Sequence, residues 1–325
     1  MQLSSYMEQL SNGQLDLNDF LQQIKGCWKI LKDDDIFFNL SAQHFGVPIK
    51  NATDRDAVKK IFYQNLERIE SLSDYDQEAA FGITFVTFMD SAEFIRTYLM
   101  KNILADELSL GETENVQGNL TNAINPIVNQ GQCGSCWSFA TAVTMETSYY
   151  QKNKKLLKLS EQQFVNCDKQ DSGCNGGWMS SAYTYAKGTG IAQQSTNPYV
   201  AKEQKCTAPA GTTVKVQSYT QLGAKNPNAI INALNNGYAV AIALDASTSQ
   251  FMYYTGGILT NASVCSGNNM NHAVNIIGYG TANNTPYWIV RNSWGTGWGE
   301  KGYVRIKRGI NYCSMEAAPF TVNIA

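Results

Sequence analysis

Apolar side chains in the first third of the chain recur at the spacing of amphipathic helices. The positions follow i, i+3, i+4 and i+7, which share one face of a helix, and the first such series is Leu17, Phe20, Leu21, Ile24, Trp28 and Leu31. Acidic residues at 33–35 come next. Because negative charge opposes the dipole at a helix C-terminus, we assign this run to a loop. A second helix is predicted over about 54–71, with Ala57, Ile61, Leu66 and Ile69 near one face.

Beyond residue 112 the pattern divides into a helical half and a β-rich half. The helical half contains a run at 137–150 with few helix breakers, a helix start at 159–163 that resembles a capping box, and a third run near 180–187. From about residue 214 short apolar or alternating runs bounded by Gly, Asn and Thr predict strands. These runs are 238–244, 273–279, 287–291 and 302–307. This order of elements predicts an α+β fold.

The net charge and the apolar runs of the chain give no support to a nucleic-acid or membrane partner. With 325 residues it can bury a large core divided over two or three units. Its net charge of −2 offers no electrostatic attraction for nucleic acid or an anionic membrane. No apolar run approaches the roughly 18–20 residues that span a bilayer. The N-terminal residues lack the basic region and apolar core of a signal peptide, so either a signal has been removed or the protein does not enter the secretory route.

The stretch 130–140 carries the first candidate for chemistry. It reads Gln-Gly-Gln-Cys-Gly-Ser-Cys-Trp-Ser-Phe-Ala and leads Cys136 into the predicted helix at 137–150. On the first turn of a helix, free backbone N–H groups and the helix dipole favour the thiolate, which is the nucleophilic form of cysteine. An isolated cysteine is more often a half-cystine or an inert core thiol, so the assignment depends on the accompanying motifs.

A histidine and an asparagine lie in two further motifs. The chain has two histidines, His44 and His272, and His272 begins an apolar run that ends in Gly-Tyr-Gly, the pattern of a strand entering a turn. Asn292 lies in Tyr-Trp-Ile-Val-Arg-Asn-Ser-Trp-Gly-Thr-Gly-Trp-Gly, again a strand followed by a glycine-rich loop. Taken singly, such residues are a core histidine and a turn former. Together with 132–137, they resemble in sequence and order the active-site motifs of papain-like cysteine proteases, the cathepsin family.

This resemblance implies a fold, an activity and roles for five residues. The fold would have a helical lobe and a β-barrel-like lobe, and the activity would be that of a cysteine endopeptidase without cofactor or metal. Cys136 would attack the peptide carbonyl, His272 would hold the thiolate as an ion pair and move its proton, and Asn292 would orient the imidazole. Gln130 would offer its side-chain amide, beside the backbone N–H of Cys136, to the oxyanion. Trp294 would shield the bond between Asn292 and His272 from water.

The resemblance also implies a peptide-binding surface. Gly176 and Gly177 match the segment that pairs with the main chain of an extended peptide, and Asn271 lies beside the catalytic histidine. The positions that line the pocket for the P2 side chain are Trp178, Met179, Ala243, Ala273 and Ala318. All five are apolar, which predicts a hydrophobic P2 residue and protein or peptide substrates.

Six further cysteines lie in the catalytic part of the chain, and sequence alone allows 15 pairings of six cysteines. The resemblance implies the pairs Cys133–Cys174, Cys167–Cys206 and Cys265–Cys313. Three disulfides indicate an oxidising compartment, such as a lysosome, a vacuole or the outside of the cell. Zinc ligation by the Cys-x-x-Cys at 133–136 is an alternative, but no second close pair follows at the distance of a zinc finger.

Residues 1–112 resemble the prosegment of cathepsin L-like zymogens. Phe62, Asn65 and Ile69 match the second half of its long-helix motif, whereas Val58 and Ser73 depart from it, and 81–94 resembles the second prosegment motif. Residues 1–35 exceed the usual prosegment as an extension. The resemblance implies that this region lies through the cleft in the direction opposite to substrate and blocks the nucleophile. The polar stretch 108–125 would be the linker to a catalytic domain at 113–325.

Two alternatives remain open at this point. The family's usual start of the mature chain is missing at 117–119, where Gln-Gly-Asn stands. A non-enzymatic structural or binding protein that keeps its prosegment permanently is therefore an alternative to the protease. In a further alternative, 1–112 would act in trans as an inhibitor or chaperone of other proteases.

Overall fold

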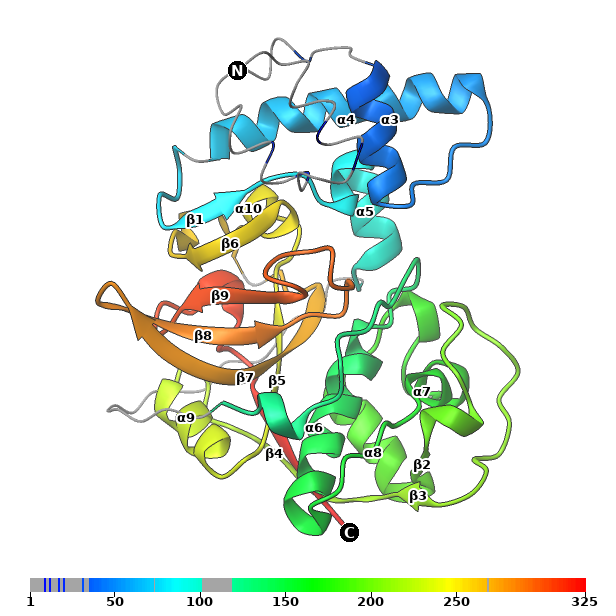
Figure 1. The fold of residues 1–325 in the computed structure, drawn as a ribbon. Helices are drawn as coiled ribbons and strands as arrows, with labels where there is room; N and C mark the ends of the chain where they lie inside the picture. Colours follow the sequence, from blue (N-terminus) through cyan, green and yellow to red (C-terminus); the bar gives the residue numbers. More distant parts are fainter. Residues whose placement is uncertain are drawn as a thin grey trace.

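The computed structural model describes residues 35–72, 74–100, 119–267 and 269–325, together with the isolated positions 9, 12, 17, 20 and 31. Three parts are visible in Figure 1: a lobe of helices, a lobe built on a large sheet, and a helical N-terminal part that lies across one edge of that sheet. The helices are α3 (Asp35–His44), α4 (Ala52–Leu72), α5 (Ser91–Tyr98), α6 (Cys136–Asn153), α7 (Glu161–Cys167), α8 (Met179–Thr189), α9 (Pro227–Asn235) and α10 (Ser249–Met252).

An eight-stranded sheet has the order β1-β6-β9-β8-β7-β5-β10-β4. Its neighbours are antiparallel except for β6 and β9. The strands are β1 (Ala79–Phe81), β4 (Val216–Gln221), β5 (Val240–Leu244), β6 (Tyr254–Leu259), β7 (His272–Ala282), β8 (Thr285–Arg291), β9 (Tyr303–Lys307) and β10 (Phe320–Ile324). A separate ladder pairs β2 (Ile191–Ala192) with β3 (Thr213–Val214) in the helical lobe. The sequence prediction of an α+β fold with a helical and a β-rich half is confirmed.

Helix α6 is the central element of the helical lobe. Every residue from Cys136 to Ser148 is buried, which is typical of a helix that is covered on all sides rather than on one face. Helix α7 begins at the predicted position, where the Ser160 side chain accepts a hydrogen bond from the backbone N–H of Gln163. Helix α8 covers the third predicted run.

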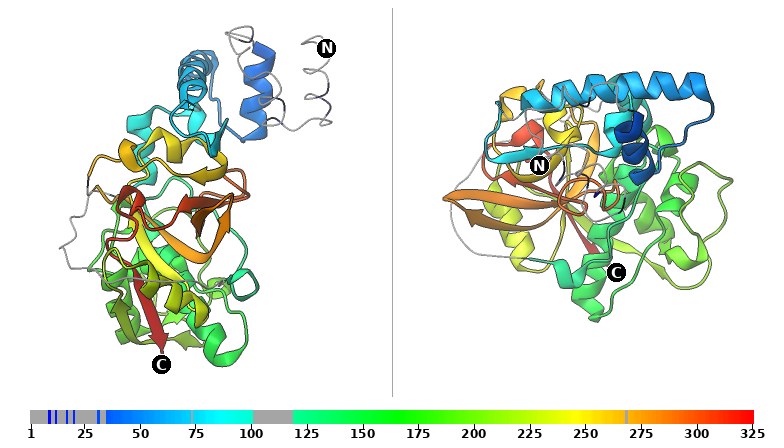
Figure 2. Two further views of the ribbon diagram at one scale, coloured as in Figure 1. Left: turned by 90° about the vertical axis from the view of Figure 1, so that its left-hand side faces the viewer. Right: turned by 45° about the horizontal axis from the view of Figure 1, so that its top comes forward.

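The N-terminal part packs through an aromatic face of α4. The helix spans 21 residues, as the spacing at about 54–71 predicts, and Phe62 stacks on Phe88 with ring centroids 4.7 Å apart. The buried Asn65 donates from its side-chain amide to the carbonyls of Thr87 and Met89, so it holds the following segment against the helix. Strand β1 then adds to the edge of the sheet by pairing with β6. The side view in Figure 2 shows α4 and α5 stacked on the sheet lobe.

A carboxylate joins this N-terminal part to the sheet lobe. Asp76 is 3% exposed, and one of its oxygens accepts from the backbone N–H groups of Thr260 and Asn261 at 2.6 and 3.1 Å. The other accepts from the Thr260 hydroxyl at 2.8 Å. At the strand pair itself, Gly257 has a φ of +78°, and a Cβ there would lie 2.2 Å from the Glu78 carbonyl. The close approach of β1 therefore requires glycine at this position.

One expectation about this region is wrong. The acidic run at 33–35 was assigned to a loop after a helix, but Asp35 is the first residue of α3. There it lies at the N-terminal end of a helix dipole, where negative charge is favourable, and it forms ion pairs with Arg55 and Lys59 at 2.6 and 2.9 Å. Most of the first predicted helix lies outside the described residues, although Leu17, Phe20 and Leu31 are buried.

The described residues contain three disulfides, Cys133–Cys174, Cys167–Cys206 and Cys265–Cys313. These are the pairs that the family resemblance implies, and Cys136 is the free cysteine within this part of the chain. None of the helices in the described ranges combines the length and apolar character needed to cross a membrane.

A buried ionic cluster joins α6, α7 and the loop between them. The Lys158 ammonium contacts the carboxylates of Glu146 and Glu161, whose side chains are 1% and 0% exposed. Glu146 also accepts from the backbone N–H of Leu159 at 2.9 Å. Burial raises the pKa of Glu161, and the ammonium of Lys158 opposes that rise.

We expect Lys158→Met to destabilise the protein by about 3–5 kcal/mol at neutral pH, because it leaves two buried carboxylates without a counter-charge. The loss should be smaller near pH 4, where the raised pKa of Glu161 allows protonation. Urea unfolding of the full chain at both pH values measures this, with the exposed Lys155→Met as the matched control. Equal losses at the two pH values would contradict the electrostatic explanation.

Candidate active site

Cys136 is the first residue of α6 and lies where the helix meets the sheet lobe. Its side chain is completely buried, and Sγ accepts a hydrogen bond from the backbone N–H of Ala273 at 3.4 Å. Ala273 is the second residue of β7. The sulfur from the helical lobe therefore lies against the beginning of a strand from the other lobe, next to His272.

The hydrogen bonds of His272 define its tautomer. Its Nε2 lies 2.7 Å from Oδ1 of Asn292, and that oxygen also accepts from the backbone N–H of Ser293. Because Oδ1 only accepts, Nε2 carries the hydrogen and a neutral imidazole leaves Nδ1 unprotonated. Nδ1 is buried and has no hydrogen-bond partner among the described residues. It is the ring atom free to take a proton from a thiol.

Burial keeps both groups neutral in this covered state. It raises the pKa of Cys136 to about 12, against the opposing hydrogen bond from Ala273, and lowers the pKa of His272 to about 4. The sequence argument expected the helix terminus to favour the thiolate and His272 to hold it as an ion pair. That expectation is wrong for the covered site, because the loss of hydration destabilises the charged forms more than these hydrogen bonds stabilise them.

Trp294 covers the histidine. Its ring lies 4.6 Å from the imidazole centroid at an interplanar angle of 32°, and its side chain is 2% exposed. Phe251 packs edge-on against Trp294 at 5.4 Å, and Phe94 of α5 does so at 5.2 Å from the N-terminal part. The bond between His272 and Asn292 is thus enclosed by aromatic rings.

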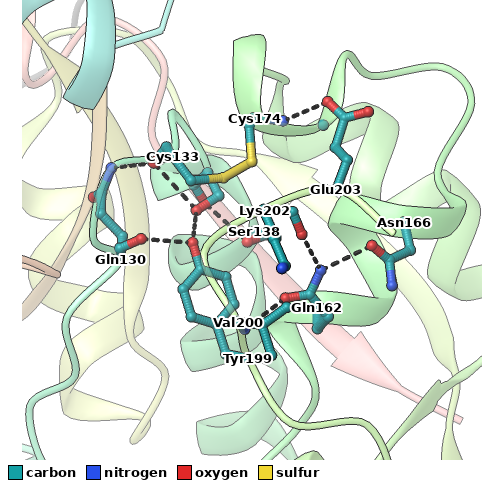
Figure 3. Close-up of a disulfide and its surroundings, with 12 residues drawn as sticks. Gln130, Cys133, Ser138, Gln162, Asn166, Cys174, Tyr199, Val200, Lys202 and Glu203 are labelled. Carbon is teal, nitrogen blue, oxygen red and sulfur yellow. Dashed lines mark hydrogen bonds between the residues drawn. A yellow bond between two sulfur atoms is a disulfide. The ribbon is translucent and has the colours of Figure 1, made fainter. Parts of the chain in front are cut away.

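Gln130 contacts both lobes and the N-terminal part. Its Oε1 accepts from the Ser293 hydroxyl at 2.7 Å, which leaves Nε2 as the donor to the carbonyls of Cys133 and Tyr98, each at 2.9 Å. Figure 3 shows the bond to Cys133 beside the disulfide. The Tyr98 carbonyl of the N-terminal part thus accepts from the amide that the sequence analysis assigned to the oxyanion.

The segment 98–100 lies over the nucleophile. Beyond the Tyr98 carbonyl, the backbone N–H of Met100 donates to the carbonyl of Asn271 at 2.6 Å. The Asn271 side chain faces away, because it donates to Asp245 and accepts from the N–H of Ala246. Met100 shares one apolar cluster with Cys136 and with four of the five residues assigned to the P2 pocket, namely Met179, Ala243, Ala273 and Ala318, and Trp178 packs at its edge.

The two glycines assigned to peptide binding lie in a tightly packed turn. A Cβ on Gly177 would lie 2.5 Å from the Trp137 ring and 2.7 Å from Cγ of Asp171. Asp171, which sequence reasoning missed, accepts from the backbone N–H of Trp178 at 2.8 Å, and burial raises its pKa to about 8. This bond fixes the backbone at Trp178, directly after the two glycines. A lone Asp in a turn gave no signal for this.

No group of three or more His, Cys, Asp or Glu side chains in the described ranges could hold a metal ion. Cys133 of the Cys-x-x-Cys forms a disulfide with Cys174, which removes the zinc alternative for this pair. The chemistry that the site supports comes from its thiol, imidazole and amide groups.

Comparisons with known proteins agree with this geometry. Residues 114–322 match the model of the papain family of cysteine proteases. Vignain of Phaseolus vulgaris is 43% identical over 194 residues, which cover 58% of this chain and 52% of that relative, so the chain matches about half of its length. The viral cathepsin of Spodoptera litura multicapsid nucleopolyhedrovirus is 33% identical over 282 residues, 80% of this chain and 82% of the relative.

A solved structure shares the fold over most of this chain. Digestive procathepsin L 3 from the larval midgut of Tenebrio molitor is 28% identical, with a TM-score of 0.78 over 88% of this chain and 97% of the other. That protein is a proenzyme, and its likeness extends over the N-terminal part as well as the two lobes. These matches favour the peptidase over a non-enzymatic protein of the same fold. The chain belongs to the papain family of cysteine proteases, and its fold is that of a papain-like proform.

Proposed function

We propose that the chain is a cysteine endopeptidase that is made as a self-inhibited zymogen and prefers a hydrophobic residue at P2. The observation that carries this proposal is the joint placement of the buried thiol, the imidazole oriented by Asn292, and the Gln130 amide at one point between the lobes. Its three disulfides suit an oxidising compartment, and we propose the lysosome, a vacuole or the outside of the cell as its location.

The reaction follows from the groups present. Once the cleft is open, Nδ1 of His272 takes the thiol proton and Sγ of Cys136 attacks the carbonyl carbon. The oxyanion receives hydrogen bonds from Gln130 Nε2 and the backbone N–H of Cys136. The C–N bond breaks as His272 returns the proton to the leaving amine. A water molecule, deprotonated by His272, then attacks the thioester carbon. The C–S bond breaks, the acid product leaves, and His272 returns the proton to the Cys136 sulfur.

The N-terminal part inhibits by occupying the substrate positions in reverse. Along the chain, the segment passes from Phe94, which contacts Trp294, and Tyr98, whose carbonyl meets Gln130, to Met100 in the apolar pocket. A substrate with its P2 side chain in that pocket and its scissile carbonyl at Gln130 runs in the opposite direction. The bound segment therefore blocks the nucleophile without offering a correctly oriented peptide bond.

The activated enzyme should hydrolyse peptides with Leu or Phe at P2 and show little activity with Arg there, because the pocket residues are apolar and a buried guanidinium lacks a counter-charge. Cys136→Ser should lose at least about 10³-fold in kcat/KM by removal of the nucleophile. Fluorogenic peptides that differ only at P2 measure both. Undiminished cleavage by Cys136→Ser would remove the proposal.

Asp76→Asn should speed self-activation of the zymogen. The charged carboxylate accepts three hydrogen bonds from Thr260 and Asn261, and charge-assisted bonds of this kind contribute about 1.5–3 kcal/mol each. We expect the rate of activation to rise about tenfold, with the kcat of the mature enzyme unchanged. The time course of peptidase activity after dilution into activation buffer measures it. The exposed Asp74→Asn is the matched control, and equal half-times for the two variants would contradict the docking role.

Acid should destabilise the covered form through His272. Its pKa is about 4 in the structure and 6.5 ordinarily, so an exposed imidazole binds a proton between these values that the buried one does not. The free energy of unfolding should fall as the pH falls through this window. The equilibrium constant for unfolding should rise by up to about tenfold per pH unit.

Unfolding of the Cys136→Ser chain across this pH window tests the contribution of His272, because this variant cannot cleave itself. The double variant Cys136→Ser/His272→Gln is the comparison and keeps all other titrating groups. Its dependence on pH should be shallower by about one proton. Identical slopes would show that burial does not suppress protonation of His272.

A further inference from the structure

Tyr199 lies next to the catalytic turn but outside the groups assigned to the reaction. It follows the short helical turn Gln194–Thr196, and its side chain points toward Gln130 beside the disulfide Cys133–Cys174 (Figure 3). The hydroxyl donates to the main-chain carbonyl of Gln130 at 2.7 Å. It also lies 2.5 Å from the hydroxyl of Ser135, the residue before the nucleophile.

The direction of these two bonds can be assigned. A carbonyl only accepts, so the single proton of the Tyr199 hydroxyl goes to Gln130, and Ser135 must donate to Tyr199. Burial raises the pKa of Tyr199, which keeps the phenol protonated. The result is one continuous chain from the Ser135 hydroxyl through Tyr199 to the Gln130 carbonyl. Its two ends are the residues that position the Cys136 backbone N–H and the Gln130 amide.

The loop that carries Tyr199 is held rigidly. The Phe139 ring meets the Tyr199 ring edge-on at 4.8 Å. Next along the loop, the backbone N–H of Val200 donates to the buried Gln162 of α7 at 2.8 Å, and Gln162 donates to the carbonyl of Lys202 at 2.9 Å. Figure 3 shows the two hydrogen bonds of Gln162, to Val200 and Lys202. The phenol therefore has a fixed position from which it can fix another group.

We propose that Tyr199 is a positioning residue that fixes the spacing between the two oxyanion donors, the Gln130 amide and the backbone N–H of Cys136. The inference rests on the proposed peptidase function and deepens it. Without the hydroxyl, the Gln130 carbonyl loses a buried partner and the turn between Gln130 and Ser135 loses a cross-link. Preorganised donors are effective in proportion to how little they must reorganise, so the loss should appear in the chemical step.

Tyr199→Phe in the activated enzyme tests this directly. We expect kcat to fall about tenfold, less than the roughly 10²–10³ caused by removing a whole oxyanion donor, with KM changed less than about twofold because the apolar pocket is untouched. The inhibition constant of a peptide aldehyde, whose hemithioacetal oxygen occupies the oxyanion position, should rise about as much as kcat falls. A purely structural role would not lower kcat and weaken aldehyde binding while leaving KM almost unchanged.

Tyr183→Phe is the matched control. This variant also removes one buried phenol hydroxyl. The Tyr183 hydroxyl lies 2.7 Å from the hydroxyl of Thr144, which is in α6, like Cys136, but away from the nucleophile. The variant should retain the kcat of the wild type. An equal fall in kcat for both variants would assign the effect to general loosening of α6 and overturn the proposal.

A double-mutant cycle with Gln130→Ala gives the decisive readout. If Tyr199 acts through Gln130, Tyr199→Phe should change kcat by less than about threefold in the Gln130→Ala background. The same factor in both backgrounds, or no fall in the wild-type background, would overturn the inference while leaving the peptidase proposal intact. A wild-type chain without peptidase activity would remove the proposed function, and the inference with it.

Discussion

The contact between α6 and β7 is the constraint on which the rest of this structure depends. The backbone N–H of Ala273 in the strand donates to the sulfur at 3.4 Å, and two residues farther along, the side-chain amide of Asn275 donates to the Ala140 carbonyl of α6 at 3.0 Å. Two bonds between the same helix and strand fix both the distance and the register of the two lobes. The packing of the helix against the strand therefore places the thiol next to the start of β7, where the imidazole lies.

The same packing accounts for the inactive state that we propose for the covered protein. Close contact removes water, and the desolvation cost acts on the thiolate and the imidazolium together, so Cys136 and His272 are both neutral. The segment at Tyr98–Met100 adds a steric block and completes the enclosure. The inhibition that we propose would therefore be both steric and electrostatic. If the segment leaves, water can enter the cleft, and we expect the pKa of Cys136 to fall and that of His272 to rise, which favours the ion pair proposed for catalysis.

The parts of this arrangement that are encoded locally could be read from the sequence. Helical spacing located α4, short apolar or alternating runs located β7 and β8, and the motif order predicted that Cys136, His272 and Asn292 share one site. Contacts between distant segments could not be read. Asp35 depends on Arg55 and Lys59 across a helix pair, and Asp171 acts on a turn seven residues away. The charge state of Cys136 was missed because a helix terminus is visible in sequence, whereas complete burial is a property of the assembled fold.

Gln130, the proposed oxyanion donor, is held in place although it lies in a loop without regular structure. Its side-chain oxygen accepts from Ser293 of the sheet lobe, and this bond forces the amide nitrogen to face the cleft. Its main-chain carbonyl is held by Tyr199 of the helical lobe. One lobe thus sets the orientation of the amide and the other sets its position, so the donor is correctly placed only while the lobes keep the spacing that α6 and β7 impose. The geometry of the proposed oxyanion site is therefore a consequence of lobe packing, which explains why a glycine-rich loop suffices to carry it.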